Sequence, residues 1–242
     1  MVVSYQPVLV LLSIAVAIIG SLTALALTSG SHDLDSESWE TSFSLANGGL
    51  VMGTTIWSMH FIAMMAVQFP ALINYNIVET ILSIGIAMCA TSMGLYVVSN
   101  RRLGNFSIPG AAVLMGLGIA SMHYLGMSAI RGCGLDYDLV LVAASVAIAI
   151  IASMAALWFA FYKRTIVTTL AGGVVQGLAI ASMHYTAMAA TYFVPLTAPA
   201  DLTNPLFTQN LLAFMIAGAM VIVCTGNLTL LGFMSMQQKR LV

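Results

Sequence analysis

The chain alternates between long apolar segments and short polar ones. Because about 20 apolar residues are what an α-helix needs to cross a bilayer core of roughly 30 Å, each long segment predicts a membrane-spanning helix. Seven such segments occur, and the charged residues lie mainly between them. The predicted helices cover about residues 7–28, 46–69, 76–99, 107–130, 139–162, 168–194 and 209–234.

The composition of the chain supports a membrane protein. Of its 242 residues, 60% are hydrophobic and only 6% are charged, which excludes an ordinary soluble domain. Strands of a membrane β-barrel would alternate apolar and polar residues, and the apolar segments show no such alternation. We therefore predict an all-α membrane protein. The first segment lacks the charged start and cleavage site of a signal peptide, so we expect it to remain as a helix.

The cationic side chains predict the orientation of the helices. With the N-terminus outside and the C-terminus inside, only Arg131 of the 7 lysines and arginines lies on the outer side. The opposite orientation would place the other six outside, against the positive-inside rule. The net charge of −1 gives no indication of nucleic-acid binding. The six cytoplasmic cations are Arg101, Arg102, Lys163, Arg164, Lys239 and Arg240.

The second, fourth and sixth predicted helices carry the same short motif. In each copy serine, methionine and histidine are consecutive, and a second methionine follows the histidine by four residues. The motif contains all but one of the 4 histidines of the chain. Because two membrane crossings separate equivalent positions, we expect the copies at one depth, in the outer half of the membrane. The copies are Ser58-Met59-His60-Phe61-Ile62-Ala63-Met64, Ser121-Met122-His123-Tyr124-Leu125-Gly126-Met127 and Ser182-Met183-His184-Tyr185-Thr186-Ala187-Met188.

Small residues precede each histidine at fixed distances. A glycine lies seven residues before it, and a glycine or alanine lies eleven before. At about 100° per residue, these positions share one helix face with the histidine and the later methionine. Small residues spaced by four let membrane helices approach closely. We therefore expect the motif helices to touch one another through these residues, in a pseudo-threefold arrangement with the histidines and methionines converging beyond. The small residues are Gly49 and Gly53, Ala112 and Gly116, and Gly173 and Gly177.

The recurrence also predicts how the chain is organised. Each motif helix and the plain apolar helix after it form a unit of about 60 residues, and the first helix precedes the three units. The units cover about residues 46–106, 107–167 and 168–234. The whole chain, residues 1–242, is then one seven-helix membrane domain.

The motif combines imidazole nitrogen with thioether sulfur. Without a carboxylate or thiolate nearby, this ligand set favours copper, particularly Cu(I), whereas zinc prefers cysteine or a carboxylate. Haem is one alternative, because histidines from two helices can bind its iron, although the small residues favour helices too close for haem. Another alternative is a histidine that only bridges helices by hydrogen bonds. The predicted metal ligands are His60, His123 and His184, with Met64, Met127 and Met188, and more weakly Met59, Met122 and Met183.

The same ligands fit more than one function. A fixed copper centre indicates a sensor, whereas a copper transport or delivery protein would pass the ion along its helices. Ligands at several depths would favour transport, and all three motif copies lie at one depth, which favours a fixed site. An enzyme acting within the membrane is disfavoured, because the spans bring no acid, base and nucleophile together.

Met183-His184-Tyr185-Thr186 is the signature from which the MHYT family takes its name, and the chain resembles that family over its whole length. The resemblance implies a bacterial sensor domain of the inner (cytoplasmic) membrane that binds copper near the outer face through the motif methionines and histidines. It would sense a diatomic gas (oxygen, carbon monoxide or nitric oxide) or redox state. The first copy departs from the signature because Phe61 replaces the tyrosine, and only the third copy keeps the threonine.

The resemblance further implies an output in the cytoplasm. Many members of the family are joined to domains that make or degrade cyclic di-GMP, and nothing similar to those domains occurs in this sequence. We therefore expect no enzyme activity in this chain and a signalling domain or partner at its C-terminus. Copper is the expected cofactor, the lipid bilayer and the gas are the other expected partners, and a homodimer is left open.

Overall fold

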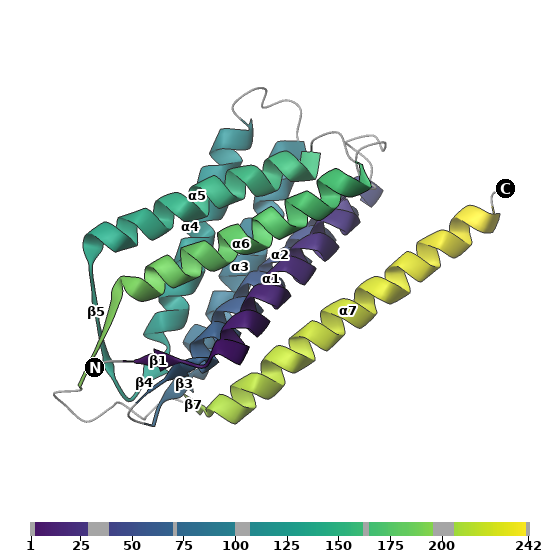
Figure 1. The fold of residues 1–242 in the computed structure, drawn as a ribbon. Helices are drawn as coiled ribbons and strands as arrows, with labels where there is room; N and C mark the ends of the chain where they lie inside the picture. The colour runs from purple at the N-terminus through teal and green to yellow at the C-terminus, as the bar shows by residue number, and fades with distance from the viewer. Residues whose placement is uncertain are drawn as a thin grey trace.

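The computed structural model describes residues 3–28, 39–69, 72–99, 107–161, 165–195 and 206–240. Seven helices account for most of these residues, and each contains a stretch long and apolar enough to cross a membrane. The prediction of an all-α protein with seven membrane-spanning helices is confirmed, and the chain is a multi-pass membrane protein. The helices are α1 (Pro7–Thr28), α2 (Trp39–Met65), α3 (Ile77–Ser99), α4 (Ser107–Ser128), α5 (Leu139–Phe161), α6 (Ile166–Ala189) and α7 (Gln209–Arg240) (Figure 1).

Some helix ends differ from the apolar pattern. The helix α2 begins at Trp39, before its apolar segment, and α7 continues past its apolar segment to Arg240. Backbone hydrogen bonds extend a helix into polar sequence, so hydropathy marks the membrane crossing more closely than the helix end. Conversely, α6 ends at Ala189, before the predicted end, because the chain forms a strand at Thr191–Val194.

The first six helices form a closed ring in chain order, in which each helix packs against the next and α6 packs against α1. Motif helices α2, α4 and α6 therefore alternate with the plain helices α1, α3 and α5. The helix α7 lies outside this ring, against α2, and Figure 1 shows it in yellow along one side of the bundle. At this contact Asn47 Nδ2 of α2 donates a hydrogen bond of 2.7 Å to Asn227 Oδ1 of α7.

The three plain helices of the ring repeat the same buried positions. Each has a buried serine whose hydroxyl donates to the backbone carbonyl three residues before it, and a buried alanine four residues after that serine. In space, α1 is thus the third plain helix of the ring, beside α6, and α7 is the additional helix. The unit boundaries proposed from the sequence stay a prediction. The equivalent residues are Ser13, Ser83 and Ser145, with Ala17, Ala87 and Ala149.

The glycines before the motif bring each motif helix close to a plain helix. A Cβ built on Gly53 would lie 2.6 Å from the Cα of Met88 in α3, and one on Gly116 would lie 2.6 Å from the Cα of Ile150 in α5. A Cβ on Gly177 would lie 2.6 Å from the Cα of Ile18 in α1. These backbones are therefore in direct contact, as in other close helix pairs in membranes.

These contacts correct one expectation from the sequence. The close approach exists, but the small residues of the three motif helices do not touch one another. Because a plain helix stands between each pair of motif helices in the ring, the glycines contact that plain helix. Bulkier side chains fill the space between the motif helices, among them the buried Ile56, Ile119 and Ile180.

Short strands join the helices at one end of the ring (Figure 1). Three backbone hydrogen bonds of 2.8 Å repeat there, from Gln6 N to Ala66 O, from Asn76 N to Ala129 O and from Asp138 N to Ala190 O. Each bond links the residue just before a plain helix to the residue just after a motif helix. The strands are β1 (Ser4–Tyr5) with β2 (Val67–Gln68), β3 (Asn74–Asn76) with β4 (Ile130–Arg131) and β7 (Leu206–Phe207), and β5 (Gly134–Tyr137) with β6 (Thr191–Val194).

The glycine contacts predict which substitutions destabilise the ring. Gly116→Ala should lower the free energy of unfolding by about 1–3 kcal/mol, because the new Cβ overlaps the α5 backbone. The matched control is Gly85→Ala in α3, where an added Cβ meets no atom within 4 Å. The control should be neutral or slightly stabilising, because alanine favours a helix over glycine. Thermal unfolding of the purified variants in detergent measures the difference, and equal midpoints would contradict the contact.

Candidate metal centre

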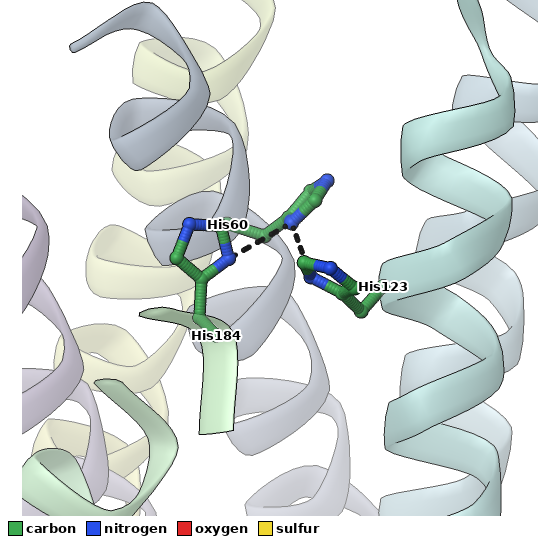
Figure 2. A group of neighbouring side chains, drawn as sticks. All are labelled: His60, His123 and His184. Carbon is green, nitrogen blue, oxygen red and sulfur yellow. Dashed lines mark hydrogen bonds between the residues drawn. The ribbon is translucent and has the colours of Figure 1, made fainter. Parts of the chain in front are cut away.

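The three motif histidines meet on the axis of the ring. Each lies five residues before the last residue of its helix, so the three rings share one depth, about 8 Å from the strand-covered end. All three are buried: His60 is 1% exposed, and His123 and His184 are 0% exposed. One nitrogen of each lies within 4.8 Å of the nitrogens of the other two. Figure 2 shows the three rings pointing toward one another from separate helices.

The Nδ1 atom of His60 lies within hydrogen-bond distance of the Nδ1 atoms of both other histidines. His60 Nδ1 lies 3.1 Å from His123 Nδ1 and 3.2 Å from His184 Nδ1. A neutral imidazole Nδ1 carries either one proton or one lone pair, so His60 Nδ1 satisfies only one neighbour with good geometry. A metal ion about 2.0–2.1 Å from each nitrogen holds tetrahedral ligands about 3.3 Å apart. The two distances from His60 Nδ1 are therefore close to the spacing of nitrogen ligands on one ion, and the third pair of histidine nitrogens lies within 4.8 Å.

The other ring nitrogens lie in a closely packed shell. The Nε2 atoms of His60, His123 and His184 are buried and have no hydrogen-bond partner among the described residues. If Nδ1 binds the ion, Nε2 carries the proton in each ring. A Cβ built on Gly126 would lie 2.5 Å from His60 Nε2. Position 126 therefore has to be small for the His60 ring to reach the axis.

The motif methionines are all buried in the same region. Each of the six is between 0% and 3% exposed, which fits thioether ligands and close packing equally well. Ligation by these sulfurs therefore stays a prediction. In the described part of the chain, the group of histidine, cysteine and acidic side chains able to hold an ion consists of the three histidines alone. The six methionines are Met59, Met64, Met122, Met127, Met183 and Met188.

The aromatic residue after each histidine supports its ring. The edge of each aromatic ring meets the histidine before it, at centroid distances of 4.7 to 5.0 Å. The hydroxyl of Tyr124 lies 2.7 Å from the hydroxyl of Ser145, and that of Tyr185 lies 2.9 Å from that of Ser13. The tyrosines thus connect a histidine-bearing helix to the neighbouring plain helix. Sequence reasoning missed this role, although the serine recurs in all three plain helices.

The first copy makes the same connection with a different residue. Phe61 has no hydroxyl, and Trp57 Nε1 instead donates a hydrogen bond of 3.0 Å to Ser83 Oγ. Phe61 packs against Tyr75 of β3, at a centroid distance of 5.7 Å. Burial raises the pKa of Tyr75, so this phenol stays protonated. The departure from the signature at Phe61 therefore leaves the helix contact in place.

An ion pair lies at the strand-covered end of the ring. Arg131 Nη2 of β4 is 3.0 Å from Glu79 Oε1 at the start of α3, and both side chains are about a quarter exposed. Arg131 also donates a hydrogen bond to the carbonyl of Ser128 at the end of α4. A partly exposed pair contributes little stability. The pair connects β4 to the start of α3.

Comparison with known proteins places the chain among bacterial signalling proteins. The family model MHYT, described as "Bacterial signalling protein N terminal repeat", matches residues 53–110 and 116–173. The bifunctional diguanylate cyclase/cyclic di-GMP phosphodiesterase MucR of Pseudomonas aeruginosa is 42% identical over 202 residues, which are 78% of this chain and 28% of MucR. The cyclic di-GMP phosphodiesterase NbdA of the same organism is 35% identical over 210 residues, 82% of this chain and 26% of NbdA.

A third relative comes from another bacterium. The signaling protein YkoW of Bacillus subtilis is 35% identical over 201 residues, which are 79% of this chain and 24% of YkoW. The chain thus spans about a quarter of the length of these curated relatives. No solved structure matches the chain. With the motif repeated on three helices of one ring and two family repeats matched in sequence, the chain is a member of the MHYT family.

Proposed function

We propose that this chain is a membrane-embedded copper-binding sensory module, which responds to a diatomic gas or to redox state. The observation that carries the proposal is the meeting of three buried Nδ1 atoms, with 3.1 and 3.2 Å between His60 and its two partners. The absence of acidic side chains and thiols from this group, among the described residues, argues against a hard cation. The buried thioethers in the same helix turns favour copper over zinc.

The spacing of the histidines disfavours the haem alternative. Two axial imidazoles of a haem stand on opposite faces of the porphyrin, and its plane extends between them. The His123 and His184 nitrogens instead both lie against His60 Nδ1. A porphyrin would have to separate the motif helices, each of which is fixed to its neighbours in the ring by backbone contact at a glycine.

A signal can leave the ring through α2. This helix carries His60, and it is the ring helix against which α7 packs. The contact includes the hydrogen bond between Asn47 and Asn227. A ligand shifts a two-state equilibrium only when it binds the two states unequally. A gas that displaces a methionine from the ion would change the packing of a motif helix, and α2 would pass the change to α7.

The comparisons support an output through a larger signalling protein. Two of the matched relatives are named for cyclic di-GMP turnover. We propose that this chain has no enzymatic activity of its own, and that a domain or partner on the cytoplasmic side of α7 responds to it. The positions of lysine and arginine support an inner-membrane orientation with the N-terminus and the strand-covered end outside.

The first test concerns copper itself. The purified chain should bind copper, and His123→Asn or His184→Asn should weaken this binding by about tenfold or more, or about 1.4 kcal/mol. The matched control is His32→Asn, which changes the histidine outside the motif and should leave the affinity unchanged. Equilibrium competition with a copper chelator measures each affinity. Equal affinities for all four proteins would leave a hydrogen-bonded histidine cluster as the better explanation.

The second test concerns the gas. Carbon monoxide added to the Cu(I)-loaded protein should give an infrared band of copper-bound carbon monoxide, and nitric oxide or oxygen should change the optical or paramagnetic spectrum. The band should be absent from the metal-free protein and weaker in His184→Asn at the same copper concentration. Met188→Leu should raise the affinity for carbon monoxide, because a competing thioether is removed. A copper-loaded protein whose spectra respond to none of the three gases would contradict gas sensing.

The third test concerns the route to α7. Asn227→Leu should leave copper affinity within about twofold, a difference near 0.4 kcal/mol, because Asn227 lies on a helix outside the ring. It should abolish any gas-dependent change in the distance between spin labels at the ends of α2 and α7. The matched control is Thr225→Val, whose hydroxyl bonds the Val221 carbonyl of its own helix. A distance change that survives Asn227→Leu would mean that this hydrogen bond is not part of the relay.

A further inference from the structure

The axis of the ring carries two more layers of side chains beyond the histidines. Four residues before each histidine is an isoleucine, and eight before are methionine, methionine and glutamine. At 1.5 Å per residue, these layers lie about 6 and 12 Å from the histidines, toward the end of the ring away from the strands. All six side chains are 1–5% exposed. The layers are Ile56, Ile119 and Ile180, and then Met52, Met115 and Gln176.

Two small cavities lie at these layers. The smaller, of about 10 Å³, is lined by the three isoleucines together with Met115, Ser153 and Gln176. The larger, of about 20 Å³, is lined by Met52, Met115 and Gln176, by Gly48 of α2, and by small or apolar residues of the plain helices. Because both cavities share Met115 and Gln176, they follow one another along the axis. Each has room for about one water-sized species.

Two polar oxygen atoms that line these cavities have no hydrogen-bond partner among the described residues. Gln176 Nε2 contacts Met52 Sδ at 3.5 Å, while Gln176 Oε1 is buried without a hydrogen-bond partner among the described residues. Ser153 Oγ, which lines the smaller cavity, is also buried without one. Burying an amide oxygen without a partner is unfavourable. Gln176 is 2% exposed, so bulk water does not supply the partner.

We propose that Met52, Met115 and Gln176 form a second site for a soft monovalent cation, Cu(I), separate from the histidine centre. Two thioethers are soft ligands. Gln176 Nε2 faces Met52 Sδ, so a half-turn of the side-chain amide, which exchanges Nε2 and Oε1, would bring the amide oxygen to the cation as the third ligand. No charged side chain lines either cavity, which disfavours Zn²⁺, Mg²⁺ and Ca²⁺. A water molecule would gain hydrogen bonds from Gln176 and Ser153 but little from two sulfur atoms.

The second site changes the balance between sensing and transport. A path for an ion requires ligands at more than one depth in the membrane. The histidine motif alone provides ligands at one depth, and the second site adds another. The isoleucine layer separates the two sites, so an ion that moves between them has to pass Ile56, Ile119 and Ile180. The chain then has two copper sites along one path, and the histidine site is the one nearer the strand-covered end.

The experiment counts ions with Ag(I), a redox-inert probe of Cu(I) sites. Because Ag(I) also binds thiols, every protein in the experiment has its 3 cysteines changed to alanine. In this background the purified full chain in detergent should bind two Ag(I) ions. Met52→Leu/Met115→Leu should retain one, since leucine conserves volume and removes the sulfur. The matched control, Met93→Leu/Met154→Leu, changes two exposed methionines on α3 and α5 and should retain two. In His123→Asn/His184→Asn the remaining ion should have sulfur neighbours and no imidazole nitrogen by X-ray absorption.

A gain-of-function variant tests the site independently of loss of folding. Gln176→Met supplies a third thioether and should tighten the second Ag(I) at least tenfold, while Gln176→Leu should weaken it. If the wild type binds one ion and the histidine variant binds none, the second site is overturned and the proposed copper sensor stands. If the single ion is retained in the histidine variant and lost in Met52→Leu/Met115→Leu, the second site stands and the histidine copper centre is overturned. Equal counts in the two methionine double variants would also overturn the second site.

Discussion

In a bilayer, helices gain little from burying apolar side chains against one another, because lipid chains are as apolar as leucine. The six-helix ring depends instead on backbone contact at glycines. Each motif helix has a glycine where a larger side chain would push it away from the neighbouring plain helix. These glycines are Gly53, Gly116 and Gly177. This contact fixes the rotation of each motif helix about its own axis. With that rotation fixed, the residue two turns further along, the histidine, points at the centre of the ring.

The centre then has to accommodate three imidazoles away from water. Their Nε2 atoms have no described partners, and their Nδ1 atoms crowd around one position at 3.1–3.2 Å from His60 Nδ1. Hydrogen bonds between neutral rings satisfy only part of this arrangement. A cation at the shared position would turn three competing acceptors into three ligands. Phe61 packs against the His60 ring, and the missing side chain of Gly126 leaves room for its Nε2 atom, so both residues fix the position of His60.

Much of the fold was predictable because it depends on periodicity along single helices. Hydropathy located the seven spans, and the helical repeat put the histidine and the glycine seven residues before it on one face. A helical face, however, does not say which neighbour it meets. The stripe of Gly116 was therefore assigned to the motif helices, whereas its real partner is Ile150 of a plain helix. The equivalence of Ser13, Ser83 and Ser145 was visible in the sequence, but serine is too common in membrane helices to be singled out without contacts.

The candidate site was predictable to a similar extent. Three histidines at equal depth indicated convergence, and the structure brings His123 and His184 each within hydrogen-bond distance of His60. The sequence alone favours packing over ligation for Met52 and Met115, because methionine occurs 17 times in the chain and because glutamine, Gln176, breaks the pattern in the third copy. Only the cavities and the unpaired amide oxygen set these residues apart from ordinary core packing.

The contact between α1 and α6 also constrains how the protein is made. During synthesis α1 is made before α6, so its face around Ile18 lacks its partner until Gly177 has been made. Contacts between such distant segments form slowly. Until α6 is inserted, the ring is incomplete: His184 is missing, and the faces of α1 and α5 that later contact α6 have no partner helix. The last motif helix therefore closes the ring and completes the histidine cluster in a single step, so an unfinished chain cannot take up an ion with the full ligand set.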